Sequence, residues 1–461
     1  RGTFCTGPAR LVGDVAVERS CSYVADGAGA VVAVLFCVLT IGVLALSVPT
    51  LTGDRGGVAL PAGETVPAGE TVPAGEYVFL LLCSLTGGVV LGYSRDLITL
   101  LVALETLTLP LYVLVGLRRG VVASVSGAIN FFVVSVVSTT VTLMGAALLY
   151  ALTGAVHLDR LATALAGRDE LREVPLTAAA VVLVLVGLAF KVAAVPFHGW
   201  APGTYDGAPL PVAAYLSTAS KVGGVVALLY VGVAALRPWW DVVGPAFALL
   251  AVLTMTVGNL VALRQTRIVR LLAWSSVAQA GYILAPLGGL TVAYADEAAV
   301  ATVVAAAIGY TLFYVLLELA AFGSLIGLRG AADGGPIEAY RGVARRSPWW
   351  AAGFGLALAG LAGLPPGLAG LFAKIVVVRA LLESGTGWLA VVVALNAVVG
   401  LAYYVRLGAL LYRPAEQAVT ARPPAAAWSV VAAVAVATLI ALVVGFAPQL
   451  VLDAATAAAL F

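Results

Sequence analysis

Long apolar segments alternate with short polar loops along almost the whole chain. Twelve of these runs are long enough to cross a bilayer, because about 20 apolar residues in a helix span its hydrocarbon layer. The pattern therefore predicts an all-α, polytopic membrane protein with twelve transmembrane helices. The runs cover residues 27–49, 77–93, 97–117, 121–151, 177–196, 212–236, 244–263, 270–290, 299–328, 349–382, 387–412 and 428–450.

Two of the runs contain prolines that a continuous transmembrane helix does not accommodate. Pro196 ends the run 177–196, and Pro365 and Pro366 lie inside the run 349–382. Proline removes a backbone donor and clashes with the preceding turn, and non-helical backbone is tolerated at membrane depth only where protein or a wet cavity satisfies it. We therefore expect two broken helices. Together with charges in both halves of the chain, they favour a transporter built of internal repeats.

Lysine and arginine are distributed very differently. The chain has 22 Arg but only three Lys, and Lys191, Lys221 and Lys374 all lie within apolar runs. An ammonium group at the bilayer centre costs about 2.5 to 3.5 kcal/mol on insertion scales, but unlike a guanidinium group it can release its proton. The pattern predicts lysines that exchange protons inside the membrane. The alternative, that they snorkel to the interface, is disfavoured by the apolar sequence on both sides of each.

A membrane carboxylate is expected to pair with one of these lysines. Glu105 lies deep in the run 97–117. Because each charge of a buried pair depends on the other, forming or breaking the pair can switch proton affinity; the alternative is a static ion pair. Two secondary candidates are His198, as a relay between Lys191 and Lys221 or as a purely structural residue, and Glu318, beside Lys374 or on the lateral path.

Composition excludes several classes of protein. A chain that is 62% hydrophobic and 10% charged is not a soluble globular protein, and its net charge of +2 gives no indication of nucleic-acid binding. The cysteines form no C-x-x-C or Cys/His cluster, so we expect no metal or iron–sulfur site in this chain alone. Cys37 and Cys83 are expected to be packing residues. Cys5 and Cys21 flank a polar segment. The sequence allows either a disulfide between them or two free thiols.

Arginine also predicts the orientation. Alternate loops hold Arg118 and Arg119, the arginines of 264–270, those of 329–346, and Arg413 with Arg422, and the positive-inside rule makes these loops cytoplasmic. Residues 1–26 and the C-terminus then face outward. Residues 51–76, where PAGETV recurs, are expected to form a flexible cytoplasmic loop. The chain lacks an initial methionine and a signal-peptide pattern, so a start within a longer protein is expected.

Four sequence blocks carry a resemblance to a known family. They are FKVAAVPFHGWAPGTYDGAPLPVAAYLSTASK (190–221), LVALETLTLPLYVLVG around Glu105, GNLVALRQTRIVRLLAWSSVAQAGYIL (258–284), and LAGLPPGLAGLFAK ending at Lys374. Over about residues 24–450 the chain resembles the antiporter-like membrane subunits of respiratory complex I, most closely the subunit N family. The first block is long and specific.

The resemblance implies a fold. The family has fourteen transmembrane helices with two inverted five-helix repeats, so the first two helices would be missing here. The helix at 27–50 would be the third of the family, the repeats would cover 77–236 and 244–412, and 428–450 would be the C-terminal helix.

The resemblance also assigns site residues. Glu105 matches the fifth-helix glutamate, Lys191 and Lys221 the seventh- and eighth-helix lysines, and Lys374 the twelfth-helix lysine that typifies subunit N. The chain departs from the pattern in the loop after Pro202, where Gly203 stands for Asp. It also has Asn130 at a position where members of the family often have Lys. We therefore assign Asn130 no role in proton entry.

The function implied is a proton-translocating membrane subunit of NADH:quinone oxidoreductase in the bacterial cell membrane. FMN, iron–sulfur clusters, NADH and quinone would belong to partner subunits and no cofactor to this chain, and subunits M and K would be its neighbours in the bilayer. The alternative is the D-type member of a multisubunit sodium/proton antiporter, which PFH in place of PLY and the GAP-x-PV loop disfavour. A third interpretation is a purely structural membrane scaffold.

Overall fold

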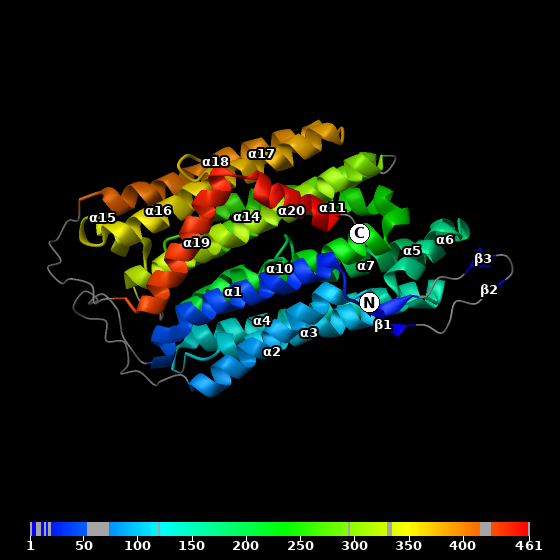
Figure 1. Cartoon of the computed structure of the whole chain (residues 1–461), viewed down its shortest axis with the longest axis horizontal. Helices are drawn as coiled ribbons and strands as arrows, with labels where there is room; N and C mark the ends of the chain where they lie inside the picture. The colour runs from blue at the N-terminus through cyan, green and yellow to red at the C-terminus, as the bar shows by residue number, and fades with distance from the viewer. Residues whose placement is uncertain are drawn as a thin grey trace.

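The computed structural model describes residues 2–5, 11–12, 15–16, 20–52, 73–118, 120–293, 296–329, 334–414 and 426–459. Helices dominate these residues, and the long ones run roughly side by side along the long axis of the molecule (Figure 1). Most of the PAGETV loop falls in 53–72, outside the described residues. The predicted all-α, polytopic architecture is confirmed.

Ten helical segments of the described chain are long and apolar enough to cross a membrane. Two further apolar helices are shorter, and they belong to the two runs in which prolines predicted a break. The ten segments are Gly27–Thr52, Ala74–Tyr93, Leu97–Val115, Val122–Thr153, Leu210–Ala235, Arg237–Ala262, Ile268–Ala293, Glu297–Leu328, Gly387–Tyr412 and Trp428–Phe446. The shorter two are Pro175–Lys191 and Pro348–Ala362.

The first half of the chain begins with strands and continues as helices. Its strands are β1 (Gly2–Cys5), β2 (Leu11–Val12), β3 (Val15–Ala16) and β4 (Cys21–Val24). Its helices are α1 (Gly27–Thr52), α2 (Ala74–Tyr93), α3 (Leu97–Val115), α4 (Val122–Thr153), α5 (Leu158–Ala166), α6 (Glu170–Glu173), α7 (Pro175–Lys191), α8 (Ala201–Gly207), α9 (Leu210–Ser217) and α10 (Ala219–Leu228), which continues as a π-helix, η1 (Leu229–Ala235).

The elements described in the second half are all helices. It comprises η2 (Arg237–Trp239), α11 (Trp240–Ala262), α12 (Ile268–Leu284), η3 (Pro286–Gly289), α13 (Leu290–Ala293), α14 (Glu297–Arg329), η4 (Ile337–Tyr340), α15 (Val343–Arg346), α16 (Pro348–Ala362), α17 (Leu368–Glu383), α18 (Gly387–Tyr412), α19 (Trp428–Phe446) and α20 (Gln449–Ala459).

The two halves meet along a seam that includes α8, α9, α12 and α14. Helix α12 packs against α8, and α14 packs against α9. In Figure 1 the helices α2, α3 and α4 of the first half lie on one side and α16 to α18 of the second half on the other, with α1 and α10 between them. Polar residues on the seam helices can therefore connect the two halves.

Both predicted helix breaks are present. Helix α7 ends at Lys191, five residues before Pro196, and the chain turns through 192–200 before α8 begins. Helix α16 ends at Ala362, and Gly363 adopts a left-handed backbone conformation (φ 82°) that glycine accepts without strain. A third interruption, at Thr218 between α9 and α10, was not predicted, because the sequence there contains neither glycine nor proline.

Hydrogen bonds connect loops and helix ends at each of the two ends of the molecule. At one end Ser20 contacts Asp159, Arg172 contacts Asp241, and Arg237 contacts Glu297. At the other end Arg267 contacts Asp206, the Ile268 amide contacts the Gly335 carbonyl, and the Gly342 amide contacts the Leu410 carbonyl. In Figure 1 α5 and α6 lie at one end of the molecule and α15 lies at the other.

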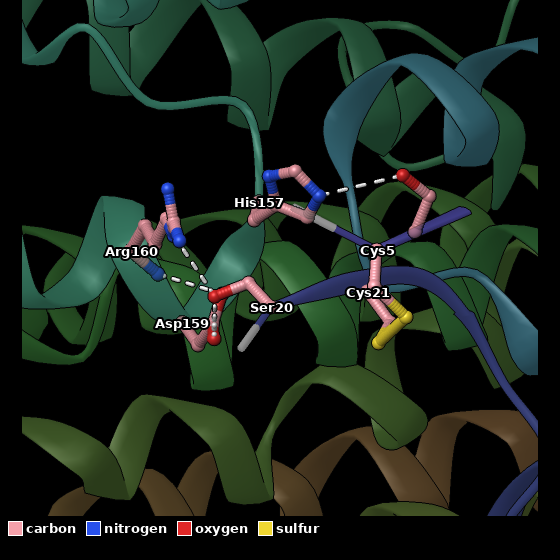
Figure 2. The surroundings of a disulfide bond; sticks show 7 residues. Cys5, Ser20, Cys21, His157, Asp159 and Arg160 are labelled. Atoms are coloured by element: carbon pink, nitrogen blue, oxygen red, sulfur yellow. Dashed lines mark hydrogen bonds between the residues drawn. A yellow bond between two sulfur atoms is a disulfide. The ribbon is translucent and has the colours of Figure 1, made fainter. Parts of the chain in front are cut away.

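The N-terminal segment forms a small hairpin that the sequence analysis missed. Strands β1 and β4 pair antiparallel, and a disulfide joins Cys5 to Cys21 (Figure 2), so of the two alternatives for these cysteines the structure contains the disulfide. Ser20 donates a hydrogen bond to Asp159 of α5 (2.6 Å) and accepts one from Arg160 (3.0 Å). The hairpin is thereby fixed to α5, an amphipathic helix in what the sequence predicted as a loop.

Glycine allows α16 and α17 to approach each other closely around the double-proline break. A Cβ atom added to Gly370 would lie 1.6 Å from the carbonyl oxygen of Gly360, and one added to Gly367 would lie 2.1 Å from the Gly360 amide nitrogen. The atoms in contact are backbone, so no side-chain rotation relieves the overlap. This contact fixes the first turn of α17, in which Gly370 lies one turn before Lys374.

We expect Gly370→Ala to destabilise the protein by about 1 to 3 kcal/mol or more, because the two helices must separate to admit the methyl group. Thermal unfolding of the detergent-solubilised complex measures the effect. The matched control is Gly408→Ala on α18, where an added Cβ meets no atom within 4 Å. Equal melting temperatures for the two variants would contradict the close packing of α16 on α17.

Candidate functional site

All three lysines bind protein polar groups with their side-chain nitrogens. Lys191 and Lys221 are buried, with 9% and 2% of their surface exposed, and Lys374 is partly buried. Each Nζ atom lies within hydrogen-bonding distance of an acceptor on a neighbouring part of the bundle. The structure therefore shows lysines directed into the protein, as the sequence predicts, and none of the three snorkels.

Lys191 and Glu105 form the expected ion pair. The Lys191 Nζ atom lies 2.9 Å from Glu105 Oε1 and also contacts the hydroxyls of Thr108 (3.4 Å) and Ser135 (3.3 Å). Thr139 donates to the same carboxylate oxygen at 2.7 Å. Helix α3 supplies Glu105 and Thr108, helix α4 supplies Ser135 and Thr139, and α7 ends at the lysine. Helices α3 and α4 thus supply hydroxyl groups to a charge pair whose lysine side chain is 8% exposed and whose glutamate side chain is 25% exposed.

Lys221 is held differently, by one residue of α12. Its Nζ atom lies 2.5 Å from the Ser276 carbonyl oxygen and 2.6 Å from the Ser276 hydroxyl. That hydroxyl lies 2.7 Å from the hydroxyl of Tyr314, which donates to the carbonyl of Ser217 (2.8 Å). Ser217 is the last residue of α9, so the break at Thr218 leaves its carbonyl available to Tyr314.

Lys374 binds the carbonyl end of the broken helix. Its Nζ atom lies 2.7 Å from the Leu361 carbonyl oxygen, in the last turn of α16, where helix carbonyls lack intrahelical partners and attract cations. The ring of Tyr282 lies 5.6 Å from the ammonium, within the range of a cation–π interaction. A Cβ added to Gly363 would lie 3.0 Å from this nitrogen, so glycine at the break also leaves room for the lysine.

Polar residues of α12 extend between Lys221 and Lys374. Ser275 bonds the Tyr404 hydroxyl, and Gln279 donates both to Tyr404 (3.0 Å) and to the Leu361 carbonyl that also binds Lys374 (3.2 Å). Tyr310 donates to the side-chain oxygen Oε1 of Gln279 (2.5 Å). Ser275 immediately precedes Ser276, which holds Lys221, so one side of α12 contacts the surroundings of both lysines.

A second polar cluster lies further along the bundle. Asn259 of α11 donates to the Tyr282 hydroxyl (3.1 Å) and accepts from Tyr403 (3.0 Å), and it also donates to the carbonyl of Asn396 on α18 (3.1 Å). The ring of Tyr282 also faces Lys374, so this cluster contacts the lysine. That contact is separate from the one through Gln279 and the Leu361 carbonyl.

The sequence analysis missed these connecting residues. Ser275, Ser276 and Gln279 follow an i, i+1, i+4 spacing in an apolar run, which places them on one side of a helix. That spacing was the available signal. The tyrosines gave none, because a tyrosine in a membrane helix is equally compatible with ordinary packing.

The two secondary candidates have different outcomes. Glu318 is fully buried in α14, one turn after Tyr314, whose hydroxyl bonds the Ser276 hydroxyl that holds Lys221. His198 lies in the turn after α7 with its ring 5.1 Å from that of Trp274. Among the described residues, no hydrogen bond joins His198 to Lys191 or Lys221. The predicted relay through His198 therefore has no direct contact to support it.

Among the described residues, no group of three His, Cys, Asp or Glu side chains is arranged to hold a metal ion. The remaining charges pair near the helix ends. Arg267 binds both carboxylate oxygens of Asp206 (3.0 and 2.9 Å), and Arg379 pairs with Glu383 four residues later (2.7 Å). Within the described parts of the bundle, Asp96 is a further buried acid, 3% exposed, and it caps α3 by accepting hydrogen bonds from the Ile98 and Thr99 amides.

Comparison with known proteins agrees with this architecture. Residues 94–400 match the family model described as NADH:quinone oxidoreductase/Mrp antiporter, TM. NADH-quinone oxidoreductase subunit N of Salinispora tropica is 59% identical over 99% of this chain and 88% of the relative. Subunit N 2 of Streptomyces griseus is 44% identical over 91% of this chain and 73% of the relative.

Solved structures give the same relationship. A chain of respiratory complex I from Thermus thermophilus, solved with bound aureothin, has a TM-score of 0.69 and 32% identity, covering 93% of this chain and 99% of that chain. A chain of the Mrp complex from Dietzia has a TM-score of 0.76 at 23% identity, covering 95% and 84%, which shows a shared fold alone. The chain is a multi-pass membrane subunit, and it belongs to the antiporter-like membrane subunits of NADH:quinone oxidoreductase, within the subunit N family.

Proposed function

We propose that this subunit carries protons across the bacterial cell membrane through Glu105, Lys191, Lys221 and Lys374 while other subunits carry the electrons. The observation that best supports the proposal is the series of polar contacts that approaches Lys374 from Lys221 along α12. A scaffold has no need of such contacts, since apolar packing would replace buried charges at no cost or with a gain in stability.

The proposed sequence starts in the first half of the chain. Lys191 accepts a proton from the cytoplasmic side while its pairing with Glu105 changes, Lys221 passes a proton laterally, and Lys374 releases one outward. The hydroxyl groups around the Lys191–Glu105 pair support the first step, because they offer Lys191 other acceptors when the pair separates. Glu318 adds an acid to the lateral segment. His198 remains a candidate that would need a side-chain movement to reach either lysine.

The partners follow from the family. We propose that the subunit lies in the bilayer beside subunits M and K, and that NADH, FMN, iron–sulfur clusters and quinone bind elsewhere in the complex. The large apolar side chains exposed on α1, α3 and α4, including Val34, Val102, Val125 and Phe132, support contact with lipid or with such neighbours.

Lys374→Ala should lower the number of protons pumped per electron while electron transfer persists in part, because the variant removes the last proton-carrying group of the path. The measurement is proton uptake during NADH oxidation by the intact complex in proteoliposomes. Arg379→Ala is the matched control, since it removes a cation from the same helix whose side chain is 74% exposed. A proton-to-electron ratio that stays at the wild-type value in Lys374→Ala would refute the assignment.

Glu105→Gln and Lys191→Met should each lower stability by about 3 kcal/mol, because each leaves the other member of a buried pair without its counter-charge. The double variant should regain most of this stability but none of the pumping. Thermal unfolding and the proton-to-electron ratio of the same preparations separate the two effects. A static ion pair would predict that the double variant recovers both.

We also propose that the end carrying the N-terminal hairpin faces outward. Disulfides persist in oxidising compartments, and the described arginines are more numerous at the opposite end.

In a Cys37→Ser, Cys83→Ser background, a membrane-impermeant maleimide should label intact cells only after mild reduction. Labelling only after lysis would place the hairpin on the inside, and labelling without reduction would show free thiols.

A further inference from the structure

Glu318 stands out among the buried acids because it lacks any hydrogen-bond partner. It has no exposed surface, and neither carboxylate oxygen accepts a hydrogen bond from a described residue. An ionised carboxylate left in this state is among the most costly groups a protein interior can contain. Glu318 therefore requires either a bound proton or an approaching cation.

The cation available to Glu318 is Lys221. Both side chains are buried, with 2% of Lys221 and none of Glu318 exposed, and they form no ion pair in this structure. Tyr314 lies one turn before Glu318 on α14 and is also bonded to Ser276, the residue that holds Lys221.

The number of hydrogen-bond acceptors around Lys191 and Lys221 indicates a different protonation state for each. An ammonium group has three N–H donors, and a neutral amine has two. Lys191 reaches three acceptors, one of them a carboxylate, which fits an ammonium. Lys221 reaches two acceptors, both on Ser276 and neither charged, which fits a neutral amine.

The direction of the neighbouring hydrogen bonds agrees with this count. Tyr314 uses its single hydrogen to donate to the Ser217 carbonyl, so the Ser276 hydroxyl must donate to Tyr314. The Ser276 oxygen is then free to accept from Lys221. If Lys221 is a neutral amine, the proton that it would carry as an ammonium has a place on Glu318.

We propose that Glu318 and Lys221 form a second acid–lysine pair that shares one proton, with Ser276 holding the amine when the proton is on the acid. In the step, the O–H bond of Glu318 breaks and an N–H bond forms on Lys221, giving a carboxylate and an ammonium with no change in net charge. Lys221 then turns from Ser276 towards Glu318. This inference rests on the proposed function and adds a proton-holding group to its lateral segment.

The test is Glu318→Gln in the intact complex, with Glu297→Gln as the matched control. Glu297 lies on the same helix with a side chain that is 91% exposed. Glu318→Gln should remove the infrared carbonyl band of a buried protonated carboxylic acid and should lower the proton-to-electron ratio. Glu297→Gln should do neither. The shared-proton pair would be overturned if Glu318→Gln kept the infrared band, or if it kept the wild-type proton-to-electron ratio.

A second variant covers the case in which Glu318→Gln fails to assemble. Ser276→Ala leaves both titratable groups in place but removes a hydrogen-bond acceptor of the neutral amine, so the proton should move towards Lys221 and the acid band should weaken. An unchanged band would overturn the proposal. If Lys374→Ala lowers the proton-to-electron ratio while Glu318→Gln leaves it unchanged, this inference fails and the proposed function stands.

Discussion

The structure depends on how three lysine side-chain nitrogens are accommodated inside a largely apolar bundle. Each lysine nitrogen needs acceptors, and each obtains them in a different way: Lys191 from a carboxylate and two hydroxyls, Lys221 from a single serine, and Lys374 from a helix carbonyl. Helix breaks supply part of this chemistry, because a broken helix exposes carbonyls that a continuous helix would use itself. Backbone geometry and side-chain chemistry are therefore inseparable at these positions.

The seam between the two halves determines how far these groups can act on one another. Helix α12 lies against α8 of the first half and contributes the serines and the glutamine that contact the surroundings of Lys221 and Lys374. Neither half contains the whole series of contacts. A change in the packing of the halves would alter the distances between lysines without altering any residue that binds them.

Much of the fold could be predicted from the sequence, since apolar runs of spanning length are a strong signal and proline marks two of the three breaks. The break at Thr218 could not, because the helix is interrupted there without the glycine or proline that marks such a break in a sequence. The Lys191–Glu105 pair was foreseeable, as few partners exist for a membrane carboxylate. The binding of Lys374 to Leu361 was not foreseeable, because every residue has a carbonyl and sequence does not mark which one a broken helix leaves free.

That last contact has a consequence for how such a chain can change over time. A main-chain carbonyl persists whatever side chain occupies the position, so substitutions at Leu361 leave the acceptor of Lys374 in place, and the Ser276 carbonyl gives Lys221 the same protection. Drift in the surrounding helices is then tolerated as long as the breaks keep their geometry. Selection should then fall on Lys374 and on the glycines that shape the backbone around it, and hardly at all on Leu361, whereas Ser276 is constrained by the hydroxyl that also binds Lys221.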